Sequence, residues 1–153
     1  WPGKIKPGSK SDEMVQNLDF AQTFLEAAHI EAPSDMQGES MIPLLTGKTE
    51  KWTRDAVYYH YYEYPQPHHV APHFGIRTTR YKLIRFYGPH NDWELFDLQK
   101  DPTEMKNLIN DPTYATTIVS LKKELKDLME HYQDFEALTT WKTTETTIQE
   151  MPK

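Results

Sequence analysis

The chain has 153 residues, 26% of them charged and 37% apolar, which predicts one compact domain with a modest core and excludes collagen-like, low-complexity and wholly disordered chains. Its net charge of −6, with basic residues spread along the chain, predicts no nucleic-acid or membrane partner, because both require a clustered positive surface. The absence of cysteine excludes disulfides, thiolate metal sites and cysteine nucleophiles from this chain. No apolar run approaches the roughly 20 residues of a membrane helix, and a start at Trp1-Pro2-Gly3 without methionine indicates a piece of a longer protein.

Two short helices are predicted in the first third of the chain. Asp19 is a candidate N-cap for a helix that runs to about Ile30, before Pro33 stops its continuation. One stripe of this helix is apolar, with Phe20, Phe24, Leu25 and Ala28 at helical spacing. Ser40 is a candidate cap for a short turn over residues 41–45, ended by Gly47.

Four strands are predicted over residues 56–64, 74–79, 81–87 and 93–98. The first run, Ala-Val-Tyr-Tyr-His-Tyr-Tyr-Glu-Tyr, consists mostly of the aromatic and branched residues that suit a pleated sheet. The short links between the runs predict an antiparallel meander, because a parallel crossover needs a dozen or more residues.

Helices are predicted after the fourth strand. Asp101-Pro102-Thr103-Glu104 combines a cap, a proline at the first helical position and an acid three residues after the cap, which predicts a short helix. Asp111-Pro112 begins a longer amphipathic helix to about Phe135, which we expect to pack on one face of the sheet. After Phe135 the tail is polar and is expected to be extended or disordered at its end. The predicted core includes Leu83, Leu95, Leu121, Leu125 and Leu128.

Six short motifs, in this order, resemble the C-terminal part of a type I, formylglycine-dependent sulfatase. The resemblance covers about residues 1–135 and is to bacterial sulfatases that act on sulfated sugars, including those similar to N-acetylglucosamine-6-sulfatases and iduronate-2-sulfatases. The motifs are Trp1-Pro2-Gly3-Lys4-Ile5, Asn17-Leu18-Asp19, Gln37-Gly38-Glu39-Ser40 with Pro43-Leu44-Leu45-Thr46-Gly47, Gly75-Ile76-Arg77-Thr78 with Tyr81-Lys82-Leu83-Ile84, Glu94-Leu95-Phe96-Asp97-Leu98, and Asp101-Pro102-Thr103-Glu104 with Asn107-Leu108.

The resemblance implies an α+β fold, with a four-stranded antiparallel sheet packed against a long C-terminal helix. Residues 1–50 would be the incomplete end of the large sulfatase α/β domain, residues 51–138 the smaller C-terminal subdomain, and residues 139–153 a polar tail. The implied partners are the N-terminal catalytic domain of the parent chain and a sulfated saccharide. The parent would be a periplasmic or secreted sulfuric ester hydrolase of the alkaline phosphatase superfamily.

The catalytic groups of that family are absent from this chain. The resemblance implies formylglycine, made from Cys or Ser in a Cys/Ser-x-Pro-x-Arg motif, and calcium held by hard oxygen ligands. None of the serines is followed by Pro and Arg at the required positions, and no Asp-Asp, Asp-Asn or Asp-His pair occurs. We therefore expect no catalytic residue, metal ligand or cofactor here and no activity from this chain alone, with calcium and formylglycine supplied by the rest of the parent.

The candidate binding segment joins the first two strands, Glu63 to His73, where three prolines restrict an irregular polar loop. By the resemblance, such loops reach the rim of the sulfate pocket, which makes His68, His69 and His73 candidate substrate-binding residues. Two alternatives stay open: these histidines are ordinary surface residues of a proline-rich connection, or together with His60 they bind a metal ion. Pro72, between His69 and His73, argues against the metal site because it disfavours helical spacing.

Other side chains have structural interpretations beside functional ones. Arg77 could meet a sulfate group, but we expect it to pair with Glu94 or Asp97 across the sheet. Trp93 and the tyrosines of residues 58–64 could stack on sugars, although aromatic strand residues usually belong to the core. For the chain as a whole, the alternatives to a sulfatase part are a non-catalytic scaffold or carbohydrate-binding module, and part of a related phosphoester or phosphonate hydrolase.

Overall fold

The computed structural model describes the backbone of residues 1–149 and the side chains of residues 1–143. The chain separates into two compact units, unit 1 (Trp1–Asp55) and unit 2 (Ala56–Lys153). Within the described part of the chain, no helix combines the length and the apolar content needed to cross a membrane.

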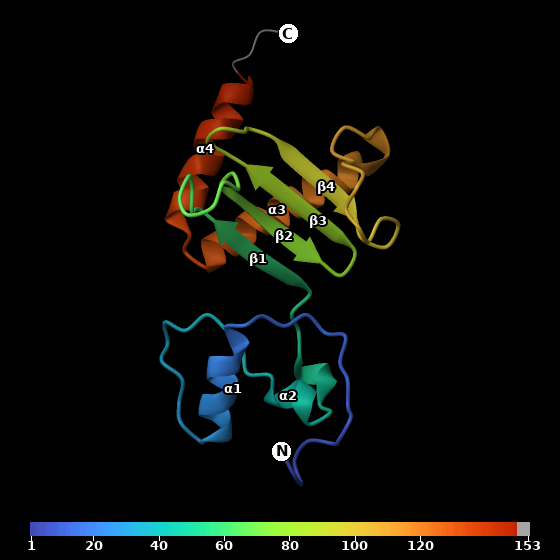
Figure 1. Cartoon of the computed structure of the whole chain (residues 1–153), viewed down its shortest axis with the longest axis vertical. Coiled ribbons are helices and arrows are strands. Elements are labelled where there is room, and N and C mark those ends of the chain that lie inside the picture. Colours follow the sequence, from blue (N-terminus) through green and yellow to red (C-terminus); the bar gives the residue numbers. More distant parts are fainter. Residues whose placement is uncertain (150–153) are drawn as a thin grey trace. The chain divides into compact units, whose positions relative to one another are not determined.

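Unit 2 contains one antiparallel sheet with the strand order β1-β2-β3-β4 (Figure 1). The register pairs Ile76 with Leu83 and Leu83 with Leu95, so apolar side chains line up across one face of the sheet. The predicted meander is therefore confirmed. Its strands are β1 (Ala56–Tyr61), β2 (His73–Thr78), β3 (Tyr81–Phe86) and β4 (Trp93–Asp97).

Helix α3 (Ala115–His131) supplies the other half of the unit 2 core. It follows a 3-10 turn, Pro112–Tyr114, that Asp111 caps as predicted, with its carboxylate accepting from the Thr113 N–H at 2.9 Å. The predicted core is confirmed: four of its leucines are buried, and the fifth is partly buried against them. These residues are Leu83, Leu95, Leu121, Leu125 and, partly buried, Leu128.

A further helix, α4 (Phe135–Gln149), occupies the region where an extended tail was expected, so that prediction is wrong up to residue 149. The chain turns between the helices at Gln133 (φ 56°), where the Asp134 N–H donates to the carbonyl of Met129 at 3.0 Å. The Asp134 carboxylate then caps α4 by accepting from the Ala137 N–H at 2.9 Å. Because Ala137 is fully buried and Trp141 packs against the core, tertiary contacts stabilise a helix whose sequence has no sustained period. The last four residues of the predicted tail lie outside the described residues.

The helix predicted at Asp101-Pro102-Thr103-Glu104 is also wrong, since no helix occurs between β4 and Pro112. The Asp101 carboxylate accepts from the Lys106 N–H at 2.8 Å in an irregular turn. The chain then follows the outer edge of β4, where the Leu108 N–H donates to the carbonyl of Leu95 at 2.8 Å. Pairing with a sheet edge and burial of Leu108 outweigh the local helix signal.

Unit 1 contains two helices, α1 (Asp19–Ala27) and α2 (Ile42–Leu45), and a 3-10 turn, Thr49–Lys51. Helix α1 ends earlier than predicted, in a left-handed turn at His29 (φ 58°), where the Ile30 N–H donates to the carbonyl of Leu25 at 2.9 Å. Gly38 lies against the start of α1, because a Cβ there would come within 2.4 Å of the Leu18 carbonyl oxygen. This close approach requires glycine and brings residues 37–40 beside α1.

Candidate functional site

The loop between β1 and β2, which Figure 1 shows between these two strands, carries exposed histidines and tyrosines. Residues 62–70 are all exposed, including His68 and His69, and Tyr62 retains 65% of its surface. Two cis peptide bonds, Tyr64-Pro65 and Gln66-Pro67, shape the loop. It offers two imidazoles and two phenol rings to solvent, groups that can hydrogen-bond sugar hydroxyls and stack on sugar faces.

The third histidine, His73, lies at the start of β2 with its ring among aromatic side chains. Its centroid is 5.5 Å from Tyr61, in a stacked geometry, and 5.0 Å from Phe86. Its Nδ1 lies 2.9 Å from the carbonyl oxygen of Ala71, and a carbonyl only accepts, so Nδ1 carries the proton. The Tyr87 N–H also donates to the carbonyl of Pro72 at 3.0 Å. The C-terminal end of the loop is therefore held by two hydrogen bonds, one from His73 in β2 and one from Tyr87, which follows β3.

His60 belongs to a different site, a partly buried cluster between β1 and the α3–α4 turn. Its Nδ1 lies 2.7 Å from Asp134 Oδ2, and its Nε2 lies 2.7 Å from the hydroxyl of Tyr87. The Tyr58 hydroxyl donates to the same Asp134 oxygen at 2.7 Å. The contacts of His60 therefore do not support the metal-site hypothesis. The described residues also contain no group of three or more side chains that could bind a metal ion together.

The electrostatics of this cluster favour an ionised Asp134 and protonated hydroxyls on Tyr58 and Tyr87. Burial tends to raise the pKa of Asp134, but hydrogen bonds from the Ala137 N–H, the Tyr58 hydroxyl and His60 outweigh it and lower that pKa below its usual value. Burial and the nearby carboxylate raise the pKa of Tyr58 well above its ordinary value. Burial, Glu136 and Asp134 raise the pKa of Tyr87 to about 12. Neither phenol ionises near neutral pH, so the cluster supplies no nucleophile. Its hydrogen bonds connect β1 to the α3–α4 turn.

Asp134 and Tyr87 were not predicted as partners of His60. The only local signal was an Asp followed by Glu136, the pattern of a helix cap with an acid in the first turn. Their meeting with His60 depends on where α3 ends, which the sequence pattern did not predict.

The aromatic strand residues divide between core and surface. Trp93 contacts Trp141 edge-on at 5.3 Å and packs against the core, and Tyr58 stacks on Tyr132 at 6.0 Å. Tyr62 and Tyr64 stay exposed. The core interpretation holds for Trp93 and Tyr58, which leaves Tyr62 and Tyr64 as the rings that could stack on a ligand.

Arg77 was expected to pair with Glu94 or Asp97, and the pairing with Asp97 is wrong. The buried Asp97 carboxylate accepts from Arg80 Nη2 at 2.9 Å, and this bond outweighs burial to lower the pKa of Asp97. Arg77 is exposed and pairs with Lys82 in the register, whereas Asp97 pairs with Tyr81, so Arg77 and Asp97 fall on opposite faces of the sheet.

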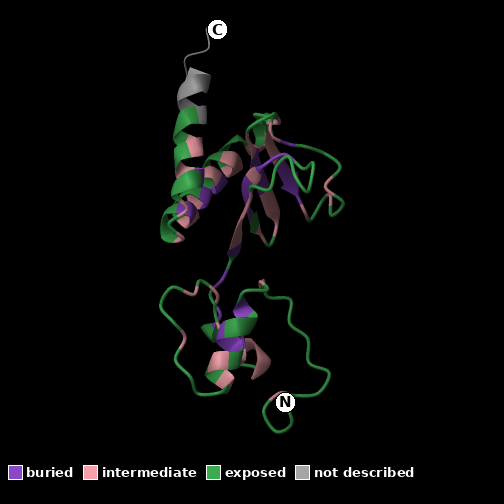
Figure 2. Ribbon diagram, turned by 60° about the vertical axis from the view of Figure 1, so that its left-hand side comes forward, coloured by how far each residue is buried: buried purple, intermediate pink, exposed green. Residues whose placement is uncertain are grey.

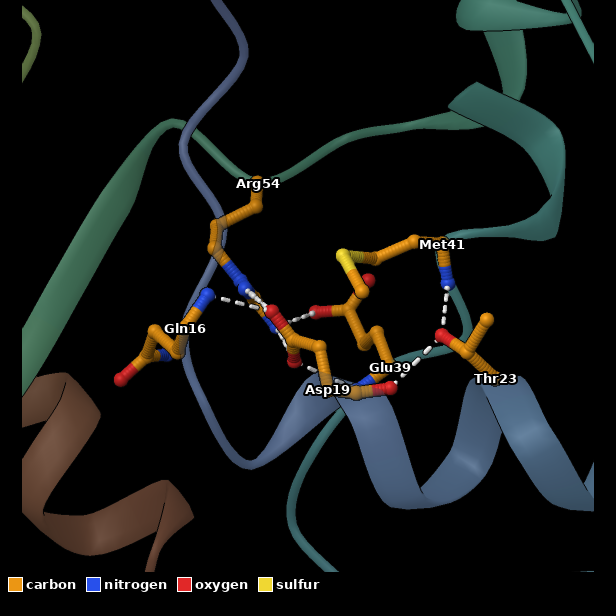
Figure 3. A network of polar contacts seen from close by, with 6 residues as sticks. All are labelled: Gln16, Asp19, Thr23, Glu39, Met41 and Arg54. Carbon is orange, nitrogen blue, oxygen red and sulfur yellow. Dashed lines mark hydrogen bonds and ion pairs between the residues drawn. The ribbon is translucent and has the colours of Figure 1, made fainter. Parts of the chain in front are cut away.

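A second polar cluster lies in unit 1, around Asp19 (Figure 3). The Asp19 carboxylate accepts from Arg54 Nη1 at 2.5 Å and Nη2 at 2.8 Å, and from the N–H groups of Gln16 and Glu39 at 2.6 and 2.9 Å. Helix α1 begins at Asp19, and Leu18 occupies its N-cap position. The prediction of Asp19 as the N-cap is therefore wrong. Burial tends to raise the pKa of Asp19, but Arg54 and the two N–H donors lower it overall.

Comparison with known proteins gives the context of these sites. Residues 1–131 match the family described as "N-sulphoglucosamine sulphohydrolase, C-terminal". The chain is 46% identical over 136 residues to an N-acetylglucosamine-6-O-sulfatase of Bacteroides thetaiotaomicron, covering 88% of this chain and 24% of that protein. The chain thus spans about a quarter of the length of this relative.

Two solved structures extend the comparison. One, of a protein in complex with its substrate D-glucosamine-2-N,6-O-disulfate, is 44% identical with a TM-score of 0.83 and covers 88% of this chain and 28% of that one. The other, a phosphonate monoester hydrolase from Silicibacter pomeroyi, is 23% identical with a TM-score of 0.73 and covers 86% of this chain and 28% of that one. The second likeness is one of fold alone.

Proposed function

Because the chain belongs to the N-sulphoglucosamine sulphohydrolase C-terminal family, we propose that its parent, the longer protein that carries this region, hydrolyses sulfate esters of a sulfated carbohydrate. The 46% identity to an N-acetylglucosamine-6-O-sulfatase carries this proposal. That identity favours a sulfatase over the phosphonate hydrolase alternative, whose 23% identity supports only a shared fold. A non-catalytic module is likewise not favoured by these matches.

In the parent, unit 1 would be the end of the large catalytic domain and unit 2 the C-terminal subdomain. Formylglycine and calcium would belong to the N-terminal portion. The residues of this chain do not fit either group, because it has no cysteine and no serine in the required motif, and its described residues form no cluster of metal ligands. Residues 1–153 would therefore contribute to substrate binding and stability.

The β1–β2 loop is the part of this chain that we assign to sugar recognition, through His68, His69 and His73. Its support is local: His68 and His69 are exposed on a loop whose C-terminal end is held by hydrogen bonds at Ala71 and Pro72. A held loop presents its side chains with less loss of conformational entropy on binding. His73 would contribute through Nε2, since Nδ1 is already engaged.

The test is the parent enzyme assayed on a 6-O-sulfated glucosamine saccharide, on an aryl sulfate and on a phosphonate monoester. We expect turnover of the two sulfate esters. In the His69→Ala variant, kcat/KM on the saccharide should fall by the equivalent of about 1–3 kcal/mol, the range for a lost hydrogen bond that leaves a polar partner unpaired. The aryl sulfate, which has no sugar to contact, should be hydrolysed almost as before.

His131→Ala is the matched control, because His131 is exposed at the end of α3 and away from the loop sequence. Turnover of the phosphonate alone would overturn the sulfatase assignment. Equal losses on both sulfate esters would mean a catalytic or stability role for His69, and no loss on either would make it an ordinary surface residue.

A further inference from the structure

A groove in unit 1 lies between the loop at the start of the chain and helix α2. Its lining residues come from two stretches of the chain, residues 4–13 and residues 44–49, and it has a volume of about 550 Å³. Three lysines line it from the first stretch, and all three are exposed, like most of the green loop beside the N-terminus in Figure 2. We call it the lysine groove, after Lys4, Lys6 and Lys10.

These lysines differ from those of unit 2 in having no charge partner. Within the described part of the chain, none of the three forms a side-chain hydrogen bond or an ion pair. In unit 2, by contrast, Lys82 pairs with Glu104 at 2.7 Å and Lys123 pairs with Asp127 at 2.5 Å. Residues 1–10 contain three lysines and no acidic residue, in a chain whose net charge is −6. This segment therefore presents positive charge that no ion pair neutralises, and such charge attracts an anionic group.

The other lining residues suit a sugar better than a bare anion. Asp12 and Glu13 line the same groove, and their carboxylates would repel an isolated sulfate but accept hydrogen bonds from sugar hydroxyls. Leu44 and Leu45 supply apolar contact for the C–H groups of a sugar ring. An adjoining cavity of about 180 Å³ shares both leucines and extends to Val15. Cations, carboxylates and apolar side chains in one groove match a ligand that carries sulfates, hydroxyls and C–H groups together.

We propose that the lysine groove is a second saccharide-binding site, which holds a sulfated sugar other than the one that reacts. This inference rests on the proposed function for the class of substrate. The β1–β2 loop does not offer the same chemistry, because residues 62–73 contain no lysine or arginine, the side chains that stay charged at neutral pH. The loop and the groove thus divide the substrate between them. The loop contacts hydroxyls of the reacting sugar, and the groove binds a sulfate elsewhere on the saccharide.

The test is a binding measurement on the parent with a glucosamine oligosaccharide that carries 6-sulfonate groups, whose C–S bond is not an ester and is not hydrolysed. Calorimetry gives the dissociation constant for the native parent and for a groove variant with Lys4→Gln, Lys6→Gln and Lys10→Gln. The variant should bind roughly 3- to 100-fold more weakly, as expected when three exposed ion pairs are lost together. The difference should shrink as salt is raised to about 1 M, where charges are screened beyond roughly 3 Å. Equal affinity of the two proteins would overturn the proposal.

The matched control removes three exposed lysines from unit 2, through Lys106→Gln, Lys123→Gln and Lys126→Gln. This control has the same net charge as the groove variant and should bind the oligosaccharide about as tightly as the native parent. Changing the three groove lysines to arginine should also keep the affinity, because the positive charge remains. An equal loss in the control and in the groove variant would mean a general effect of net charge, which would overturn the proposal.

The two acids of the groove distinguish a saccharide from other polyanions. With Asp12→Ala and Glu13→Ala, a single-stranded DNA oligonucleotide should bind the parent more tightly, because repulsion is removed. The sulfonated saccharide should bind more weakly, because its hydroxyls lose their acceptors. Tighter binding of the saccharide to this variant would mean charge attraction alone and would overturn the proposal. So would DNA that binds the native parent as tightly as the saccharide does, since the groove would then be a nucleic-acid surface.

Assays of the unmodified parent keep the two claims apart. Lysine-dependent binding by a parent that does not hydrolyse sulfate esters would reject only the proposed function. An active sulfatase whose groove variant binds the oligosaccharide like the native parent would reject only the second site. The His69→Ala variant, which is changed in the loop, should retain the binding that depends on the groove lysines.

Discussion

Unit 1 and unit 2 differ in the side chains that are buried around their main helix, although unit 2 also buries Arg85 and Asp97. In unit 2, the fully buried side chains that join sheet and helix are apolar, among them Phe74, Ile76 and Leu125. In unit 1, the buried groups around α1 are polar, centred on Asp19 and Arg54, while the phenylalanines of the helix remain exposed. Both units are compact, and among the residues whose side chains are described the apolar core cluster lies in unit 2.

Because of this difference, the two units should lose stability in different ways when a side chain is replaced. Apolar packing is adaptable, and a lost methyl group costs a graded amount that depends on the cavity left behind. A buried ion pair depends on its geometry, because removing one partner leaves the other charge without compensation. Unit 1 should therefore fail sharply when a single polar contact is removed, whereas unit 2 should weaken in proportion to the volume removed.

The largest effect is expected for Arg54→Leu. The change leaves the buried Asp19 carboxylate without its cation and should destabilise unit 1 by about 3–5 kcal/mol. Hydrogen exchange should show lost protection at the amides of residues 16–54, with the amides of the sheet unchanged. The double variant Asp19→Leu with Arg54→Leu should recover part of the loss, since no buried charge remains.

The control is Arg77→Leu, an identical change at an exposed arginine in β2. An equal loss of protection in both units after Arg54→Leu would contradict the comparison, because it would mean that the two units unfold as one.

Leu125→Ala should have the next largest effect and should act on unit 2. Leu125 is fully buried against the sheet, so its truncation should lower the free energy of unfolding by about 2–5 kcal/mol in a denaturant melt. Val119→Ala, on the exposed side of the same helix, should change it by less than about 0.5 kcal/mol. A change of that small size for Leu125→Ala would remove this face of α3 from the core.

Acid should weaken unit 1 through Asp19. Its pKa is lower in the folded chain than the value of about 3.9 in an unfolded one, so its contribution is complete above about pH 4 and is lost as the pH falls through the lowered pKa. The stability difference between the native chain and Asp19→Asn should therefore shrink below pH 4. Hydrogen exchange at α1 measured from pH 6 to pH 3 checks this, and a constant difference would contradict it.

Tyr58→Phe should have the smallest effect. It removes one donor to Asp134 and leaves the donors from His60 and Ala137, so we expect a loss of about 0.5–1.5 kcal/mol in unit 2. Tyr62→Phe, at an exposed ring on the loop, should leave the denaturant midpoint unchanged. A loss above about 3 kcal/mol would mean that the cluster is a cooperative unit whose members cannot be removed singly.

Local sequence pattern was sufficient to predict the sheet and α3. Aromatic and branched residues in the strands, with short links between them, predicted the meander. The spacing of Leu121, Leu125 and Leu128 predicted the apolar side of α3, and in unit 2 that side is the buried side. The same reasoning was misleading in α1, where the apolar stripe at Phe20 and Phe24 faces outward. Periodicity identifies the apolar face of a helix, but not whether the folded chain buries that face.

The candidate site, like the fold, was predicted only where local sequence decides the structure. The sequence pointed to an exposed, proline-restricted loop with His68 and His69, because proline and polar residues act locally on the backbone. It could not separate His60 from the other histidines, since that depends on a carboxylate 74 residues away in the chain. That contact depends on how β1, α3 and α4 pack together.

By itself, the sequence determined the antiparallel meander, the amphipathic α3, the cap at Asp111 and the family to which the chain belongs. Tertiary structure decided the conformation where it competed with local signals. Leu108 pairs with the edge of β4 instead of forming a helix, and the packing of Ala137 and Trp141 against the core stabilises α4 in a polar tail. Asp19, a predicted cap, is instead the ion-pair partner of Arg54 in the polar cluster of unit 1. The physical reason is one of magnitude, since a cap or a helix propensity is worth about 1 kcal/mol, whereas burial of a large side chain or loss of a buried charge partner is worth several times as much.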